Sequence, residues 1–302
     1  MKQQSHFIND GDHRLHIRRI FGDTKGQPVL MLHGTIENGK IFYTDKGKGL
    51  ACYLAKLGFD VYVADFRGKG ESRPTIAEEN AHGQTESITR DIPLFLDFVA
   101  QHNPKKVHVI CHSWGGVLFA SFLARYPEQL ANIASKVCFG TKRIIHSRNF
   151  EKYWKIDLLW RYVARWLARN KGYIDAKKLK FGADNETLRA LQQSNTWIYP
   201  GEWRDTDDGF DYFASAQQLS WPPTWHVTGI KDHVLGNPRD VKAFIAESNN
   251  KHAKFSVLSK AEGDLSDYGH IDILTSRLAV NDHFPKIAAW LQSVENVDQP
   301  NC

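Results

Sequence analysis

Hydrophobic residues occur along the chain in short runs, each bounded by polar or turn-forming residues. The runs are Pro28–Leu32, Phe59–Ala64, Val107–Cys111, Val137–Gly140, Thr224–Thr228 and Lys254–Leu258. Runs of this length and punctuation predict strands that are buried on both faces, as in a parallel sheet. In contrast, Leu15 and Ile17 alternate with polar residues, which predicts an antiparallel strand within 12–21 with one solvated face.

Segments with helical spacing lie between these runs. Apolar residues recur at helical intervals over 50–57, 88–101, 117–126 and 284–294. Gly58 and Pro127 follow two of these segments and are natural helix ends. Strands that alternate with helices predict an α/β fold with a doubly wound, mostly parallel sheet.

One segment, residues 144–220, interrupts this alternation. It lacks a parallel-strand signal, has strong helical patterning, and holds five of the nine tryptophans: Trp154, Trp160, Trp166, Trp197 and Trp203. Because the strand pattern resumes after it, we interpret this segment as a helical cap inserted into one core. The core would then consist of residues 1–143 and 221–302.

Composition narrows the function classes. The chain has 302 residues, of which 42% are hydrophobic and 24% charged, as in ordinary globular proteins. A net charge of +5 spread over this length does not indicate nucleic-acid binding. The four cysteines, and the histidines and acids, show no metal-ligand spacing, so we expect neither a metal nor another cofactor.

The lengths of the apolar runs also indicate where in the cell the protein is expected. None approaches the roughly 20 residues of a membrane span, and the first residues include no apolar leader segment. We therefore expect a cytoplasmic protein without membrane contact. The oligomeric state is left open.

The candidate chemistry centres on Ser113. This serine stands between the apolar run that ends at Cys111 and the helical segment from Val117, in the sequence His112-Ser113-Trp114-Gly115-Gly116. A serine in a sharp strand-to-helix turn needs very small neighbours, which Gly115 and Gly116 supply. Cys111 stands where the G-x-S-x-G motif has its first glycine, so the motif is imperfect.

Four motifs together resemble the α/β-hydrolase family. They are His33-Gly34, Asp65-Phe-Arg-Gly-Lys-Gly-Glu-Ser72, the serine turn, and the pair Thr228-Gly-Ile-Lys-Asp232 and Tyr268-Gly-His270. The segment from Thr35 to the strand run at Phe59 is similar to the acid-lipase and polyester-synthase branches. The order Ser113, Asp232, His270 is the order of this family's triad.

The resemblance implies a mechanism. Ser113 would attack an acyl carbon, His270 would act as general base, and Asp232 would orient the imidazole. The backbone N–H groups of Thr35 and Trp114 would form the oxyanion hole. A serine at this turn excludes the family members that use aspartate there, such as haloalkane dehalogenases and epoxide hydrolases.

Several neighbouring residues have structural interpretations. We expect His33 to bond backbone in its turn, and Asp65 and Arg67 to fix their loop. His112 lies beside the serine, but its side chain is expected to point away. Asp267 and Asp272, which flank His270, are the alternatives to Asp232.

The charges and tryptophans of the predicted cap give expectations about the substrate. Residues 141–180 hold twelve Lys or Arg and three acids, whereas 181–220 hold seven acids and two arginines. These charges would attract an anionic group or an amine, or would simply pair with each other. Trp154, Trp160 and Trp166 would line an acyl pocket, which predicts a small hydrophobic ester as substrate.

Three hypotheses remain at this point. The first is a serine esterase or lipase that works through an acyl-enzyme. The second is an acyltransferase or thioesterase with the same triad. The third is a catalytically silent binding protein on the same scaffold.

Overall fold

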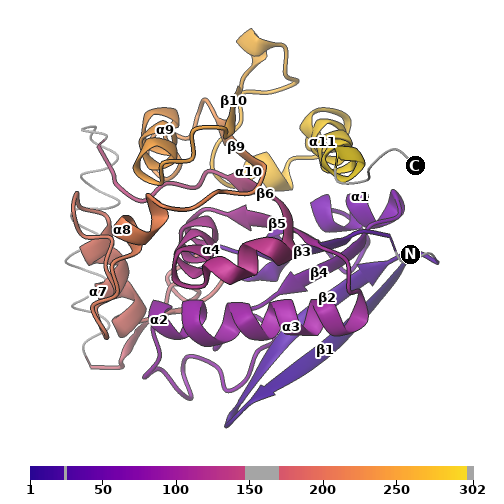
Figure 1. Ribbon diagram of the computed structural model, residues 1–302. Helices are drawn as coiled ribbons and strands as arrows, with labels where there is room; N and C mark the ends of the chain where they lie inside the picture. The colour runs from indigo at the N-terminus through magenta and orange to yellow at the C-terminus, as the bar shows by residue number, and fades with distance from the viewer. Residues whose placement is uncertain (24–25, 147–169, 298–302) are drawn as a thin grey trace.

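An eight-stranded sheet forms the centre of the molecule (Figure 1). The structure is a computed structural model, and it describes residues 1–23, 26–146 and 170–297. The strands lie in the order β1-β2-β4-β3-β5-β6-β9-β10. Their bounds are β1 Lys2–Asp10, β2 His13–Phe21, β3 Pro28–Leu32, β4 Asp60–Ala64, β5 Val107–His112, β6 Ile133–Phe139, β9 Thr224–Gly229 and β10 Lys254–Leu258. All neighbours from β4 to β10 are parallel, whereas β1–β2 and β2–β4 are antiparallel.

Five of the six strands that the apolar runs predict form the interior of this sheet. The sixth, β10, is an edge strand in which only Leu258 is buried, so the expectation that it is buried on both faces is wrong. Every residue of β3, β4, β5, β6 and β9 is buried. The alternating segment is β2, and its outer neighbour β1 was not predicted from the sequence. As an edge strand, β1 needs few apolar residues, and most of its side chains are exposed or half-buried. The hydrophobic pattern therefore carries little signal for it.

Helices cover both faces of the sheet, as a doubly wound fold requires. They are α1 Leu50–Lys56, α2 Gln84–Glu86, α3 Ile92–His102, α4 Trp114–Arg125, α9 Pro238–Glu247, α10 Asp272–Thr275 and α11 His283–Val297. In β4, Tyr62 belongs to the core cluster under α3 and α4, whereas Val61 and Val63 belong to the one under α1 and α11. Figure 1 shows α3 and α4 in front of the strands, and α1 and α11 next to each other at the right. The predicted fold class is confirmed.

The described part of the predicted cap comprises residues 144–146 and 170–220. It contains a two-stranded antiparallel pair, β7 Tyr173–Ile174 and β8 Glu186–Thr187, and two helices, α7 Leu188–Trp197 and α8 Tyr212–Ala216. Trp203, which lies between the helices, donates a hydrogen bond from Nε1 to Ser121 Oγ of α4 at 2.9 Å. Trp154, Trp160 and Trp166 lie outside the described residues. In the described ranges, no helix combines the length and apolar character needed to cross a membrane.

Candidate active site

Ser113 stands at the turn between β5 and α4, with φ 51° and ψ −124°. A positive φ is costly for a residue with a Cβ, so the surrounding structure must enforce this conformation. Close packing does so on both sides of the turn. A Cβ on Gly115 would lie 2.4 Å from the carbonyl oxygen of His33, and one on Gly116 would lie 2.3 Å from Thr141 Oγ1. The glycines thus allow the turn to sit directly against β3 and the end of β6.

The structure brings Ser113, His270 and Asp232 into one hydrogen-bonded series. His270 Nε2 lies 2.9 Å from Ser113 Oγ, and His270 Nδ1 lies 2.5 Å from Asp232 Oδ2. Asp232 follows β9 and His270 follows β10, so the three side chains meet at the carboxyl ends of parallel strands. The alternatives Asp267 and Asp272 instead accept hydrogen bonds from the backbone of Lys260 and Gly269.

Asp232 is buried and charged. Burial alone would raise the pKa of its carboxyl, but the charge and hydrogen bond of His270 lower the pKa below its ordinary value. A nearby lysine that was not singled out from the sequence, Lys142, adds to this lowering. Lys142 is itself buried. Burial lowers the pKa of its ammonium to about 8, although the charges of Asp232 and Asp240 act to raise it. Its position directly after β6 gave no indication that it would be enclosed.

The residue before one predicted oxyanion donor packs against Ser113, and the other predicted donor follows Ser113 in the chain. Gly34 precedes Thr35 and lies so close to the serine that an added Cβ would be 2.9 Å from Ser113 Cβ. Trp114 is the first residue of α4. Its backbone N–H is therefore among those that an α-helix leaves without an internal acceptor, at the end where the helix dipole favours negative charge.

The residues given structural interpretations hold the loops around this site. His33 Nδ1 donates to the carbonyl oxygen of Gly34 at 2.9 Å, and its Nε2 accepts from Phe66 N–H at 3.2 Å. Asp65 accepts from Gly39 N–H at 2.7 Å. Arg67 pairs with Asp91 and Asp10, both of which are buried or nearly so.

Comparison with known proteins identifies the scaffold. The family model for the alpha/beta hydrolase fold matches residues 27–276. The chain belongs to the α/β-hydrolase family. Lysophospholipase L2 of Escherichia coli K12 is 28% identical over 129 residues, which are 42% of this chain and 36% of that protein. The chain thus matches about a third of the length of this curated relative.

Solved structures of other α/β hydrolases share the fold. A monoglyceride lipase from Saccharomyces cerevisiae has a TM-score of 0.68 at 15% identity, over 97% of this chain and 96% of its own. A putative lipase from Acinetobacter baumannii has a TM-score of 0.63 at 17% identity, over 98% and 93%. An esterase from Thermogutta terrifontis has a TM-score of 0.61 at 17% identity, over 97% and 99%.

In this α/β hydrolase, His112 makes contacts that the sequence did not indicate. Its Nε2 lies 2.9 Å from the carbonyl oxygen of His270, and its ring packs against the ring of His270 with centroids 4.7 Å apart. Its Nδ1 lies 2.7 Å from Oε2 of Glu37, which also accepts from Gly34 N–H at 2.9 Å. No motif of the sequence pointed to Glu37 as part of the site. Its position three residues after the His-Gly turn is the signal that would have found it.

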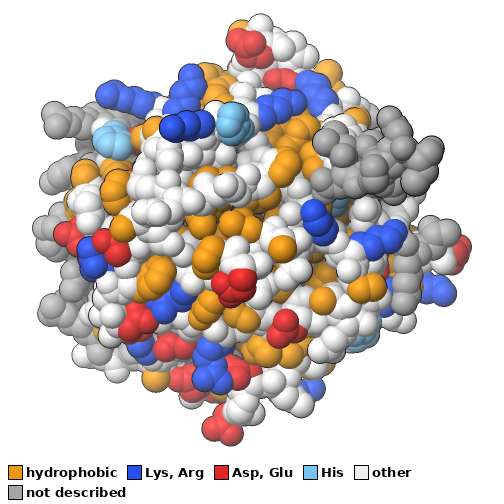
Figure 2. Space-filling model, in the orientation of Figure 1, with side chains coloured by type: hydrophobic (Ala, Val, Ile, Leu, Met, Phe, Trp, Pro, Cys, Tyr) orange, Lys and Arg blue, Asp and Glu red, His pale blue; other side chains and the backbone are white. Residues whose placement is uncertain are grey.

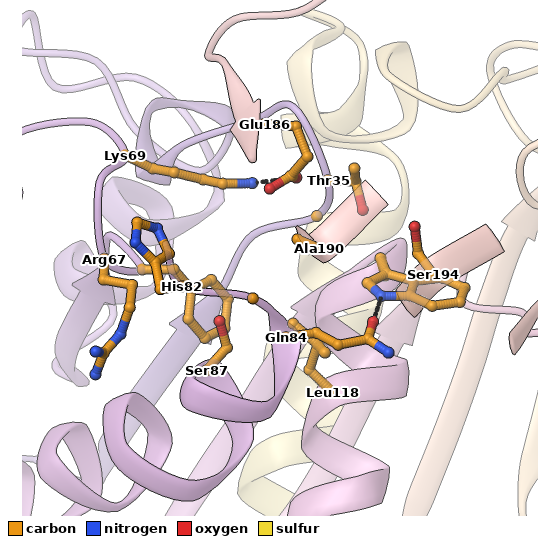
Figure 3. A pocket seen from close by; sticks show the side chains of 14 residues that line it. Thr35, Arg67, Lys69, His82, Gln84, Ser87, Leu118, Glu186, Ala190 and Ser194 are labelled. Atoms are coloured by element: carbon orange, nitrogen blue, oxygen red, sulfur yellow. Dashed lines mark hydrogen bonds and ion pairs between the residues drawn. The ribbon is translucent and has the colours of Figure 1, made fainter. Parts of the chain in front are cut away.

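The pocket beside Thr35 and Trp114 has a mixed lining. It measures about 440 Å³, part of it open to solvent. Figure 3 shows Lys69 and Glu186 pointing toward each other in its wall, with Nζ and Oε2 2.5 Å apart. Phe66, Leu118 and Ala190 supply apolar wall, whereas His82, Gln84, Ser87 and Ser194 add polar groups. Because Trp154, Trp160 and Trp166 lie outside the described residues, the acyl pocket that they would line stays a prediction.

The face of the molecule drawn in Figure 2 is also mixed in character. Figure 2 shows hydrophobic side chains in small areas between polar ones, with both acidic and basic groups on the same face. The acidic strip of the cap is paired: Asp208 and Asp205 contact Arg125, and Asp207 contacts Arg189. The described part of this strip therefore does not present free carboxylates to an amine.

Two groups of described residues place three possible metal ligands within 4.8 Å of one another: His13, Glu79 and His82, and Glu37, His112 and His270. In the first, Glu79 Oε2 lies 3.4 Å from His13 Nε2 and 2.8 Å from His82 Nδ1. In this first group, His13 Nδ1 and His82 Nε2 are buried without a hydrogen-bond partner among the described residues. In the second, Glu37 contacts His112, and the ring nitrogens of His270 contact Asp232 and Ser113. The expectation that no metal is needed stays a prediction.

Proposed function

We propose that this protein is a serine hydrolase that cleaves a carboxylic ester of a small lipid-like substrate through an acyl-enzyme. Ser113 is the nucleophile, His270 the general base and then general acid, and Asp232 the residue that orients the imidazole. The observation that carries the proposal is the unbroken hydrogen-bonded series from Ser113 Oγ through His270 to Asp232 Oδ2. The strained backbone at Ser113, which aims Oγ out of the turn, supports it.

The chemistry follows from these positions. A serine hydroxyl is a weak nucleophile near neutral pH, and His270 Nε2 takes its proton as Oγ attacks the acyl carbon. The negative oxygen of the tetrahedral intermediate is stabilised by the N–H groups of Thr35 and Trp114, each of which contributes about 3–4 kcal/mol in comparable sites. His270 then protonates the leaving alcohol, and water repeats the sequence to release the acid.

The pocket lining and the relatives favour an ester with both apolar and oxygen-rich parts. Apolar wall near Thr35 suits an aliphatic or aromatic group, and the Lys69–Glu186 pair suits a group that forms hydrogen bonds. The monoglyceride lipase and the lysophospholipase named above act on lipids that have one polar and one hydrophobic part. Lysophospholipids and monoacylglycerols are therefore the substrates to try first.

Residues 144–220 form the cap of this site in our proposal. The described contacts of this segment support it, because they reach the loop that carries Thr35. Asp184 Oδ2 accepts from Asn38 Nδ2 at 3.1 Å and from Gly70 N–H at 2.6 Å. Glu186 Oε2 lies 3.4 Å from Ile36 N.

A fluorophosphonate probe together with a p-nitrophenyl butyrate assay tests the proposal. The wild type should be labelled and should hydrolyse the ester. Ser113→Ala should not be labelled and should lose about 10⁴- to 10⁶-fold in kcat. Ser293→Ala, at an exposed serine of α11, is the control and should behave as wild type. Hydrolysis that survives in Ser113→Ala would overturn the assignment.

A further inference from the structure

The contacts of Glu37 and His112 connect three separate parts of the site. Glu37 lies in the loop after β3, which also carries Thr35. His112 is the last residue of β5 and directly precedes Ser113. His270 lies in the loop after β10. Gly34 N–H and His112 Nδ1–H both donate to Glu37, and His112 Nε2–H donates to the carbonyl oxygen of His270. These hydrogen bonds form one continuous path between the oxyanion side and the base side.

Both ring nitrogens of His112 face hydrogen-bond acceptors. A backbone carbonyl has no proton to give, so the 2.9 Å contact with His270 requires a proton on Nε2. A neutral imidazole then has no second N–H for Glu37, whose carboxylate lies 2.7 Å from Nδ1. The pair must hold one additional proton between these two atoms.

The environment places that proton on His112. Burial alone would raise the pKa of Glu37, but the charge and hydrogen bonds of His112 lower it to about 2. Burial alone would lower the pKa of His112, but Glu37 raises it. The pair is thus a buried imidazolium beside a buried carboxylate, with His112 fully enclosed and Glu37 7% exposed.

We infer that Glu37 and His112 are positioning residues that set the spacing between the oxyanion donors and the imidazole of His270. Neither forms a hydrogen bond with Ser113 Oγ or with the ring nitrogens of His270, which Ser113 and Asp232 occupy, although the ring of His112 packs against that of His270 with centroids 4.7 Å apart. Their fixed geometry holds the backbone of Gly34 on one side and the backbone of His270 on the other. The inference rests on the proposed roles of Ser113 and His270.

The size of the expected effect follows from how sharply catalysis depends on geometry. A displacement of about 1 Å in a reacting group can reduce the rate by about 10²-fold. Without the imidazole of His112, the carbonyl of His270 loses its partner and the carboxylate of Glu37 remains as an unpaired buried charge. The two loops are then free to move apart, while the pocket beside Thr35 keeps its lining.

Three variants and one matched control test the inference. The variants are His112→Ala, Glu37→Gln and Glu37→Ala. The control is His108→Ala, at a fully buried histidine of the same strand whose Nδ1 contacts Ser135 Oγ at 2.7 Å. The readouts are kcat per active site titrated with the fluorophosphonate, KM for p-nitrophenyl butyrate, and Ki of an alkyl boronic acid, which forms a tetrahedral adduct with the nucleophile.

The expected result separates positioning from folding. His112→Ala and Glu37→Ala should lower kcat per titrated site by about 10²-fold, with KM within about threefold. The Ki of the boronic acid should rise in parallel with the loss of kcat. Glu37→Gln keeps an acceptor for Gly34 and should lose only about tenfold. His108→Ala should lower the melting temperature without changing kcat per site.

Equal turnover per titrated site in His112→Ala and His108→Ala would overturn the inference. So would equal losses in Glu37→Gln and Glu37→Ala, because the retained acceptor would then have no effect. If the Ser113→Ala enzyme kept its activity, the proposed function itself would fail instead. The two failures are therefore distinguishable.

Discussion

Gly140 and His270 lie so close together that a single added carbon would collide with the imidazole. A Cβ built on Gly140 would be 2.9 Å from His270 Nδ1, the nitrogen that contacts Asp232. Gly140 follows β6 and has φ 57°. The end of β6 thus forms the wall against which the imidazole rests.

Gly140→Ala should therefore lower kcat/KM by about 10²-fold, because the ring must shift from its place between Ser113 and Asp232. The positive φ would also cost about 1–2 kcal/mol of stability. Gly11→Ala is the matched control, since Gly11 has φ 60° but nothing within 4 Å of its added Cβ. Both variants should lose similar stability in urea titrations, and only Gly140→Ala should lose activity. Wild-type turnover in Gly140→Ala would contradict a fixed imidazole.

The order of the motifs allowed much of this site to be predicted from the sequence. Ser113, Asp232 and His270 each follow an apolar run, and parallel strands end at the same edge of a sheet. The runs themselves are identifiable because strands buried on both faces contain few polar residues. For these elements, the local hydrophobic pattern agrees with the position that the strand takes in the sheet.

Other contacts depend on partners that no local pattern reveals. Glu37 and His112 are 75 positions apart, and Lys69 and Glu186 are 117 apart. Each residue alone is an ordinary charged or polar residue in a loop or at a strand end. Their burial arises only when the cap and the loops come together, so these contacts could not be predicted from the sequence.

The Lys69–Glu186 pair makes a testable contribution to stability. Both side chains are less than 10% exposed. Lys69→Met leaves an unpaired buried carboxylate and should cost about 3–5 kcal/mol. The double variant Lys69→Met/Glu186→Gln removes both charges and should recover most of that loss.

Urea denaturation of Lys69→Met, of Glu186→Gln and of the double variant gives the coupling energy between the two charges. Additive losses would show that the two charges do not depend on each other. The same set of proteins should be assayed with a monoacylglycerol and with a methyl ester of the same acid. If the pair binds the polar part of the substrate, the double variant should lose its preference between them.

The Glu37–His112 pair predicts a pH dependence of stability. The pKa of Glu37 lies at about 2 in the folded protein against 4.5 ordinarily, so its contribution is present above about pH 4.5 and is lost as the pH falls toward 2. The pKa of His112 is raised above 6.5, so its contribution is present below that value and is lost as the pH rises through the raised pKa. Stability from the pair should thus be greatest at mildly acidic pH.

The difference in free energy of unfolding between wild type and Glu37→Gln isolates this contribution. It should reach a maximum of roughly 3 kcal/mol between about pH 4.5 and 6.5 and decline on both sides. Chemical denaturation across pH 3–9 measures it. A difference that does not vary with pH would mean that the pair carries no ionic stabilisation.

The buried ammonium of Lys142 is expected to lower the free energy of unfolding near neutral pH, whereas the Glu37–His112 pair is expected to raise it. Burial lowers its pKa to about 8 from 10.5, so the unfolded chain binds the proton more tightly than the folded one. The cost to stability is full below about pH 8 and disappears as the pH rises toward 10.5. Lys142→Met should therefore raise the free energy of unfolding at pH 7 by on the order of 1–3 kcal/mol.

The gain should vanish near pH 10.5, whereas the control Lys251→Met, at an exposed site, should show no gain at either pH. A loss of stability at pH 7 would mean instead that the attraction of Asp232 and Asp240 outweighs the cost of enclosing the ammonium.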